Sequence, residues 1–108
     1  MTMNRNDIIQ GMKKLASAVL PAGAEAILFG SRARGDARAD SDWDILILID
    51  KDKATEADFA KYAYPFVNFG WSVGEQINPV IYSYSDWARR NFTLFYKNVQ
   101  NEGLSLCR

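Results

Sequence analysis

The sequence predicts one domain of the mixed α/β (α+β) class over residues 1–108, with a small mixed β-sheet flanked by helices in the order α-β-β-α-β-α. Three observations support this fold class. The length of 108 residues suffices for one apolar core and is too short for two. Apolar residues recur at helical spacing in three segments. Three short apolar runs are too brief for helices and are typical of strands.

The first helix is expected to begin near Asn6 and to close at Pro21–Gly23. Its apolar positions recur every three or four residues, as on one helical face: Ile8, Ile9, Met12, Leu15, Ala16, Val19 and Leu20. The run Ala26–Phe29 then predicts a buried strand that ends at Gly30. The polar stretch from Gly30 to Ser41 is expected to be a loop, or a loop with one helical turn.

The middle of the chain predicts a central strand and a second helix. Trp43–Ile49 is nearly all apolar and rich in isoleucine, as expected of a strand covered on both faces. Thr55 followed by Asp58 resembles a capping box, which predicts the start of a helix. Pro65 should kink or shorten this helix. Its expected inner face consists of Phe59, Tyr62, Ala63 and Phe66.

The last two predicted elements are a strand and a helix. The strand is expected over Ile77–Tyr82, where Pro79 favours an edge or bulged position because it has no amide hydrogen to donate. Ser85 is expected to cap the helix, and Glu102-Gly103 to end it. The core candidates of this helix are Trp87, Leu94, Phe95 and Val99.

The composition excludes several classes of function. Lys plus Arg equals Asp plus Glu at 13 each, so no net charge attracts nucleic acid, and nucleic acid is not an expected partner. Histidine is absent, which excludes histidine general bases and ordinary zinc sites. No membrane-spanning run or secretory signal is visible, and the single Cys107 cannot form an internal disulfide. A cytoplasmic location is therefore expected.

The stretch from Gly30 to Asp44 carries the chemistry. Gly30 and Gly35 have the spacing of a P-loop, but Asp36 and Ala37 stand where that motif needs Lys and Ser or Thr, so a P-loop is excluded.

Asp42 and Asp44, the acidic pair, lie two positions apart at the start of a strand, and the period of two turns both carboxylates to the same face. Magnesium, or manganese in its place, takes one or two carboxylates together with triphosphate oxygens and water. Gly30 and Ser31, the Gly-Ser turn, suit a phosphate, because glycine permits close backbone approach and serine supplies an amide and a hydroxyl.

Two arginines lie in the same stretch, and both they and the acidic pair also have interpretations that need no phosphate site. Arg32 and Arg34 are candidates to neutralise phosphate charge. Their alternation with Asp36 and Asp40 also fits a surface loop with local ion pairs. The acidic pair alone also fits a solvated turn ahead of an apolar strand. Its spacing from the Gly-Ser turn favours the site.

Ten residues separate the Gly-Ser turn from the acidic pair, and an apolar strand follows. This arrangement resembles the GS-x10-DxD signature of minimal nucleotidyltransferases in the DNA polymerase beta superfamily. The Ser-x-Ala-Arg-Gly and Ser-Asp-x-Asp forms are also typical of that group, and the resemblance covers Ile27–Asp50 by motif. It implies the nucleotidyltransferase fold and transfer of a nucleoside monophosphate, AMP from ATP, to a hydroxyl with release of pyrophosphate. Asp42 and Asp44 would then be catalytic and metal-binding.

One departure from the family pattern bears on activity. The family usually carries a third carboxylate on a later strand, and the best alignment places Asn78 there. An amide ligates a metal weakly and cannot act as a base. Glu75 is the alternative metal ligand, although regular alternation sends it to the opposite face from Asn78. The chain is thus either an enzyme or a catalytically impaired binding module.

The expected partners follow from the resemblance and from the aromatic residues. Members of the resembled group are often antitoxins encoded beside a HEPN-domain toxin, which some of them modify with AMP on a tyrosine. A HEPN-type protein is therefore an expected partner, and a second copy of this chain is an alternative. Five large aromatic residues are expected to exceed what so small a domain buries, which favours a partner surface: Trp71, Trp87, Phe92, Phe95 and Tyr96.

Overall fold

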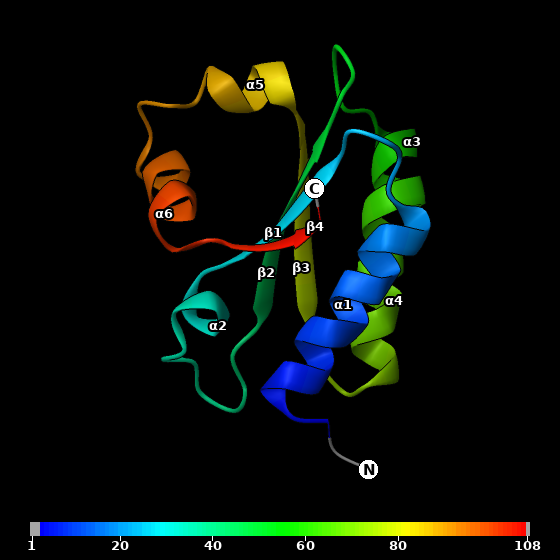
Figure 1. Ribbon diagram of the computed structural model, residues 1–108, viewed down its shortest axis with the longest axis vertical. Helices are drawn as coiled ribbons and strands as arrows, with labels where there is room; N and C mark the ends of the chain where they lie inside the picture. The colour runs from blue at the N-terminus through cyan, green and yellow to red at the C-terminus, as the bar shows by residue number, and fades with distance from the viewer. Residues whose placement is uncertain (1–2, 108) are drawn as a thin grey trace.

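A four-stranded mixed sheet with helices on both faces forms the computed structural model, which describes residues 3–107 (Figure 1). The strand order is β3-β2-β1-β4. The strands are β1 (Glu25–Phe29), β2 (Trp43–Ile49), β3 (Ile77–Ser83) and β4 (Leu104–Cys107). β2 and β3 are parallel, whereas β1 runs antiparallel to both β2 and β4. The predicted mixed sheet flanked by helices is confirmed.

The helices depart from the predicted order at several points. They are α1 (Arg5–Val19), α2 (Ser31–Arg34), α3 (Glu56–Asp58), the π-helical η1 (Phe59–Ala63), α4 (Tyr64–Ser72), α5 (Tyr84–Ala88) and α6 (Leu94–Glu102). The polar stretch from Gly30 to Ser41 is a loop with one helical turn, α2, which is one of its two expected forms. The predicted last helix is divided into α5 and α6, and β4 was not predicted.

Alternation along β2 divides the core into two layers. Ile45, Ile47 and Ile49 pack with Trp43 in the layer beneath α1 and α4. Leu46 and Leu48 face the other way and pack with Trp87 of α5 and Val99 of α6. β2 is therefore the central strand covered on both faces, as predicted, and its even-numbered side chains point toward α5 and α6.

Pro65 is accommodated without shortening its helix. Helical residues run without a gap from Glu56 to Ser72, and Pro65 lies in the first turn of α4, directly after the π-helical turn η1. The π-helical turn before it rotates the helix, since it holds one residue more than an α-turn would. Phe66 is consequently buried while Phe59 is 37% exposed, so Phe59 leaves the predicted inner face.

Pro79 lies on an edge strand, as predicted, because β3 is at one end of the sheet. The predicted cap at Ser85 is wrong: Ser83 caps α5 by accepting the Asp86 amide at 3.2 Å. Thr93 caps α6 in the same way, which explains why one predicted helix is two.

Two large hydrophobic side chains near the start of α6 are exposed. Phe92 is 76% exposed and Leu94 is 77% exposed, so the prediction of Leu94 as a core residue is wrong. Trp71 on α4 is 63% exposed, whereas Trp87 is buried. Phe95 and Tyr96 are partly buried against Trp87, so only Trp71 and Phe92 of the five aromatic residues are exposed. A partner that covers these two stays a prediction. None of the helices within residues 3–107 is both long enough and apolar enough to cross a membrane.

The predicted capping box at the start of α3 is present and gives a test of local stability. The Thr55 side chain accepts the Asp58 amide at 3.2 Å, and Asp58 accepts the Thr55 amide at 2.9 Å. Lys51 also donates to Asp58, and this bond is the main reason that the pKa of Asp58 is lowered. Thr55→Ala should reduce the free energy of unfolding by about 1 kcal/mol, measured by urea denaturation. Lys53→Ala, in the same exposed segment, should change it by less than about 0.5 kcal/mol.

Candidate active site

Strand pairing brings the Gly-Ser turn to the acidic pair. Phe29, the last residue of β1, is paired with Asp44 in β2, so the turn that follows β1 lies beside the start of β2. Gly30 has φ 78° and ψ −161°, a conformation that only glycine adopts readily. A Cβ atom on Gly30 would lie 2.9 Å from Oδ2 of Asp44. The turn and the carboxylate are therefore in direct contact.

Asp42 and Asp44 lie on the same side of β2, as the period of two predicts, while Trp43 is buried on the other side. Burial raises the pKa of Asp44, and the negative charge of Asp42 raises this pKa further, whereas the neighbouring Asn78 amide lowers it. Asp44 is half-buried and Asp42 is exposed, and two neighbouring carboxylates that repel each other are a donor set that a divalent cation would stabilise. The acidic pair therefore fits Mg²⁺ or Mn²⁺.

Asn78 lies beside the acidic pair, and its assignment to the third-carboxylate position stays a prediction. It is paired with Asp44 across the parallel strands β2 and β3, and its Nδ2 donates to Oδ2 of Asp42 at 2.9 Å. Gln76 donates to the Oδ1 of Asn78 at 3.3 Å. Within residues 3–107, no three carboxylate or cysteine side chains are grouped closely enough to hold a metal ion by themselves. Asn78 thus neighbours the acidic pair as an amide.

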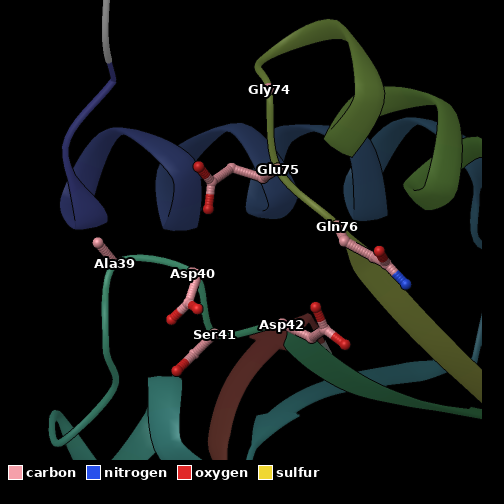
Figure 2. Close-up of a pocket in the computed structure, with 7 residues that line it drawn as sticks. All are labelled: Ala39, Asp40, Ser41, Asp42, Gly74, Glu75 and Gln76. Carbon is pink, nitrogen blue, oxygen red and sulfur yellow. The ribbon is translucent and has the colours of Figure 1, made fainter.

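Glu75 lies on the side of Trp43. It precedes β3, and its Oε1 accepts the Trp43 indole N–H at 2.7 Å. Glu75 and Asp42 line one polar pocket of about 210 Å³ together with Ala39, Asp40, Ser41, Gly74 and Gln76. Figure 2 shows the carboxylates of Glu75 and Asp42 turned to opposite sides of this pocket. Glu75 is therefore engaged by the Trp43 indole, and its carboxylate does not point toward a metal held by Asp42 and Asp44 (Figure 2).

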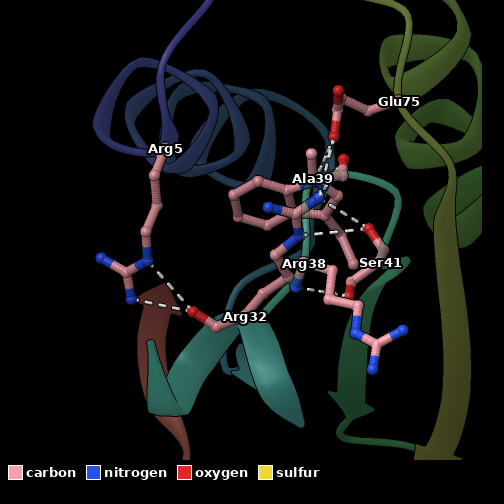
Figure 3. Close-up of polar contacts among 7 residues, drawn as sticks. Arg5, Arg32, Arg38, Ala39, Ser41 and Glu75 are labelled. Atoms are coloured by element: carbon pink, nitrogen blue, oxygen red, sulfur yellow. Dashed lines mark hydrogen bonds and ion pairs between the residues drawn. The ribbon is translucent and has the colours of Figure 1, made fainter. Parts of the chain in front are cut away.

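Both candidate phosphate-binding arginines have partners within the chain. Arg34 is paired with Asp36 at 3.2 Å and with Glu102 at 3.1 Å, and these hydrogen bonds raise the pKa of Arg34. The Arg32 guanidinium lies over the Trp43 ring. It also donates to the backbone carbonyls of Ser41 and Ala39 (Figure 3). Their phosphate contacts stay predictions. The structural use of Arg32 was missed because an arginine beside a Gly-Ser turn is typical of a phosphate site.

Backbone amides at the start of α2 lie next to the acidic pair and are available to bind a phosphate. Within residues 3–107, the amides of Ser31 and Arg32 have no acceptor, whereas those of Ala33 and Arg34 are bonded to the Gly30 carbonyl. Free amides beside the acidic pair suit the oxygens of a metal-complexed phosphate.

Comparison with known proteins settles the family. A model of the nucleotidyltransferase domain family matches residues 6–98. The chain belongs to the nucleotidyltransferase domain family. No curated protein matches this nucleotidyltransferase domain in sequence.

Solved structures resemble the nucleotidyltransferase domain in fold. A toxin-antitoxin complex with AMP-PNP contains a chain that is 23% identical, with a TM-score of 0.61 over 96% of this chain and 73% of that chain. A mutant of the MntA-HpeT toxin-antitoxin complex gives 21% identity and a TM-score of 0.61 over the same shares. A Sulfolobus solfataricus structure assigned provisionally as a nucleotidyltransferase gives 18% identity and a TM-score of 0.56, over 97% of this chain and 87% of that chain. At these identities the likeness shows the fold.

The contact at Gly30 gives a test of the site. Gly30→Ala should lower the free energy of unfolding by about 1–2 kcal/mol, since a Cβ is strained at this positive φ. It should also weaken binding of manganese-ATP, measured by calorimetric titration, because the new methyl group displaces the Asp44 carboxylate.

Gly35→Ala is the matched control, because Gly35 has φ 86° and a Cβ there would meet nothing within 4 Å. This variant should lose stability and retain manganese-ATP affinity. Equal affinity in the two variants would contradict a nucleotide site at the contact between Gly30 and Asp44.

Proposed function

We propose that this domain binds a metal-complexed nucleoside triphosphate, with ATP as the expected nucleotide, and transfers AMP to a hydroxyl. The observation that carries the proposal is the contact between Gly30 and Asp44, which joins the Gly-Ser turn to the acidic pair. It brings free amides for phosphate next to carboxylates for a divalent cation.

Each residue has a defined task in this proposal. Asp42 and Asp44 would hold Mg²⁺ or Mn²⁺, and the amide and hydroxyl of Ser31 would hold triphosphate oxygens. When bound, the metal would lower the pKa of the attacking hydroxyl and neutralise charge on the leaving pyrophosphate. The acceptor hydroxyl releases its proton to water and its oxygen forms a bond to the α-phosphorus, while the bond from that phosphorus to the bridging oxygen breaks and pyrophosphate leaves with that oxygen. Gly30 keeps the turn close enough for both sets of ligands to meet.

The acceptor in this proposal is a hydroxyl on a separate protein, with a HEPN-type toxin as the expected partner. Two structures of the same fold are toxin-antitoxin complexes, and one of them contains AMP-PNP. Exposed Trp71, Phe92 and Leu94 give this chain apolar surface that a protein partner would cover.

A second function is favoured by Asn78. Its amide occupies one oxygen of Asp42, where a third carboxylate would strengthen the metal site. An impaired domain of this kind would act as an antitoxin by docking to its partner without modifying it.

Incubation with ATP labelled at the α-phosphate, Mg²⁺ or Mn²⁺, and a HEPN-type candidate partner separates the two functions. Metal-dependent label on the partner, lost on chelation with EDTA, supports transfer. Stable binding of the partner without label supports the binding module and contradicts transfer to that partner.

A further inference from the structure

The Arg32 side chain is held by several groups within the chain. Its Nε donates to the Ser41 carbonyl at 3.1 Å, and one terminal nitrogen donates to the carbonyls of Ser41 at 2.8 Å and Ala39 at 3.1 Å. The same nitrogen lies 3.4 Å from Oε1 of Glu75. The guanidinium carbon is 4.6 Å from the centre of the Trp43 ring, and the side chain is only 12% exposed. Such planar, multiple hydrogen bonding is specific to arginine.

These contacts join three segments that carry site residues. Arg32 follows Ser31, Ser41 precedes Asp42, and Glu75 lies in the turn before the strand of Asn78. Trp43 strengthens the connection, because its ring supports the guanidinium while its indole N–H donates to Glu75 at 2.7 Å. We name Arg32, Trp43 and Glu75 the arginine clamp. Figure 3 shows the Arg32 guanidinium between Glu75 and the backbone near Ala39 and Ser41.

The segment that leads to Asp42 depends on this anchor. Within that segment, Ser41 and Arg38 are bonded to each other, which folds the segment without attaching it to the sheet. The bonds from Arg32 attach the carbonyls of Ala39 and Ser41 to the body of the domain. The Arg5 guanidinium of α1 fixes the backbone of Arg32, because two of its nitrogens donate to the Arg32 carbonyl at 2.9 Å and 3.1 Å.

The arginine clamp lies on the opposite face of β2 from the acidic pair. Trp43 belongs to the core beneath α1 and α4, whereas Asp42 and Asp44 point to the other face. The guanidinium therefore acts on the metal-binding face through the backbone of Ser41.

We propose that Arg32 is a positioning residue that, held by Trp43 and Glu75, fixes the Asp36–Ser41 segment and thereby sets the place of the Asp42 carboxylate relative to Asp44. The consequence for nucleotide binding rests on the function proposed above, whereas the ordering of the segment does not. Arg32 then contributes to affinity for metal-nucleotide by keeping Asp42 in its binding-competent place.

Hydrogen exchange of the apo protein tests the clamp without nucleotide or metal. Arg32→Lys keeps the charge and loses the planar fork, so amides in residues 36–43 should exchange about tenfold faster, as expected when one or two hydrogen bonds are lost. Glu75→Gln should accelerate the same amides in the same direction. Arg38→Ala, an exposed arginine in the same segment, is the matched control and should leave the exchange unchanged. Amides of β2 beyond residue 44 should keep their protection in every variant, which shows that the fold is intact.

A second measurement is the affinity for manganese-ATP by calorimetric titration. The clamp predicts binding about tenfold weaker for Arg32→Lys and weaker for Glu75→Gln, because fewer molecules hold Asp42 in place. A direct contact between Arg32 and phosphate predicts the opposite sign for Glu75→Gln, since removal of the competing carboxylate would free the arginine.

Unchanged apo exchange in both Arg32→Lys and Glu75→Gln would overturn the clamp. Tighter nucleotide binding by Glu75→Gln would overturn it too. If no form binds manganese-ATP, native protein included, the proposed function fails, and the apo exchange still decides whether the clamp exists.

Discussion

Asp44→Ala is expected to reduce the metal-dependent transfer of AMP by at least about a hundredfold, the largest loss expected for any single side chain of the site. Asp44 is half-buried, neighbours Asp42 and Asn78, and touches the Gly-Ser turn. Its removal should therefore take away a metal ligand at the point where the metal would meet the phosphate held by the turn. The rate of labelling by ATP labelled at the α-phosphate measures the effect. Calorimetric titration with manganese-ATP shows whether binding is lost together with transfer.

The control for Asp44→Ala is Asp52→Ala, which removes an exposed carboxylate after the opposite end of β2 and should leave transfer unchanged. Asp44→Asn, which keeps the shape of the side chain, should lose transfer as Asp44→Ala does. Native rates in a folded Asp44→Asn variant, verified by thermal unfolding, would contradict a metal-binding role for this carboxylate.

Asn78→Asp is expected to increase transfer by about tenfold or more, because it adds a negatively charged metal ligand opposite Asp44 and removes the amide bonded to Asp42. The same change should lower the thermal stability of the metal-free protein, since three carboxylates would then repel one another. Magnesium should reverse this loss, so the rise of Tm on adding magnesium should be larger in the variant than in the native protein.

Gln76→Glu is the charge-matched control for Asn78→Asp. Gln76 precedes β3 and is bonded to Asn78, so the variant adds one negative charge nearby without placing it opposite Asp44. No gain in transfer is expected from it. Equal rates in Asn78→Asp and the native protein, with native folding, would contradict the assignment of residue 78 to the third-carboxylate position.

Local chemistry made much of the site predictable. The period of two in β2 predicted that Asp42 and Asp44 share a face, and alternation predicted that Glu75 does not share the side of Asn78. The family motif predicted that the Gly-Ser turn belongs with the acidic pair, which the contact between Gly30 and Asp44 then located. The chemical roles of these residues stay predictions.

Contacts between distant segments were not predictable in this way. Arg32 has the same local sequence whether it binds phosphate or Trp43, and its burial depends on how the turn before β3 packs against β2. β4 has four residues, too few for a clear alternation, and begins one residue after α6. It pairs as a strand with the edge of β1 that β2 leaves open. Leu94 has helical spacing with core residues but lies in the first turn after the Thr93 cap, outside the contact with the sheet.

The pairing of β4 with β1 bears on the order in which the protein folds. Ile27 is paired with Leu46 on one side and with Ser105 on the other, so completion of the sheet requires closure of a long chain loop. Contacts of such sequence separation form slowly, so we expect the pairing of β1 with β2 to precede the pairing of β1 with β4. Docking of β4 also brings Glu102 to Arg34, on the helical turn that follows Ser31. We therefore expect the proposed nucleotide site to be completed only after these two remote segments have met.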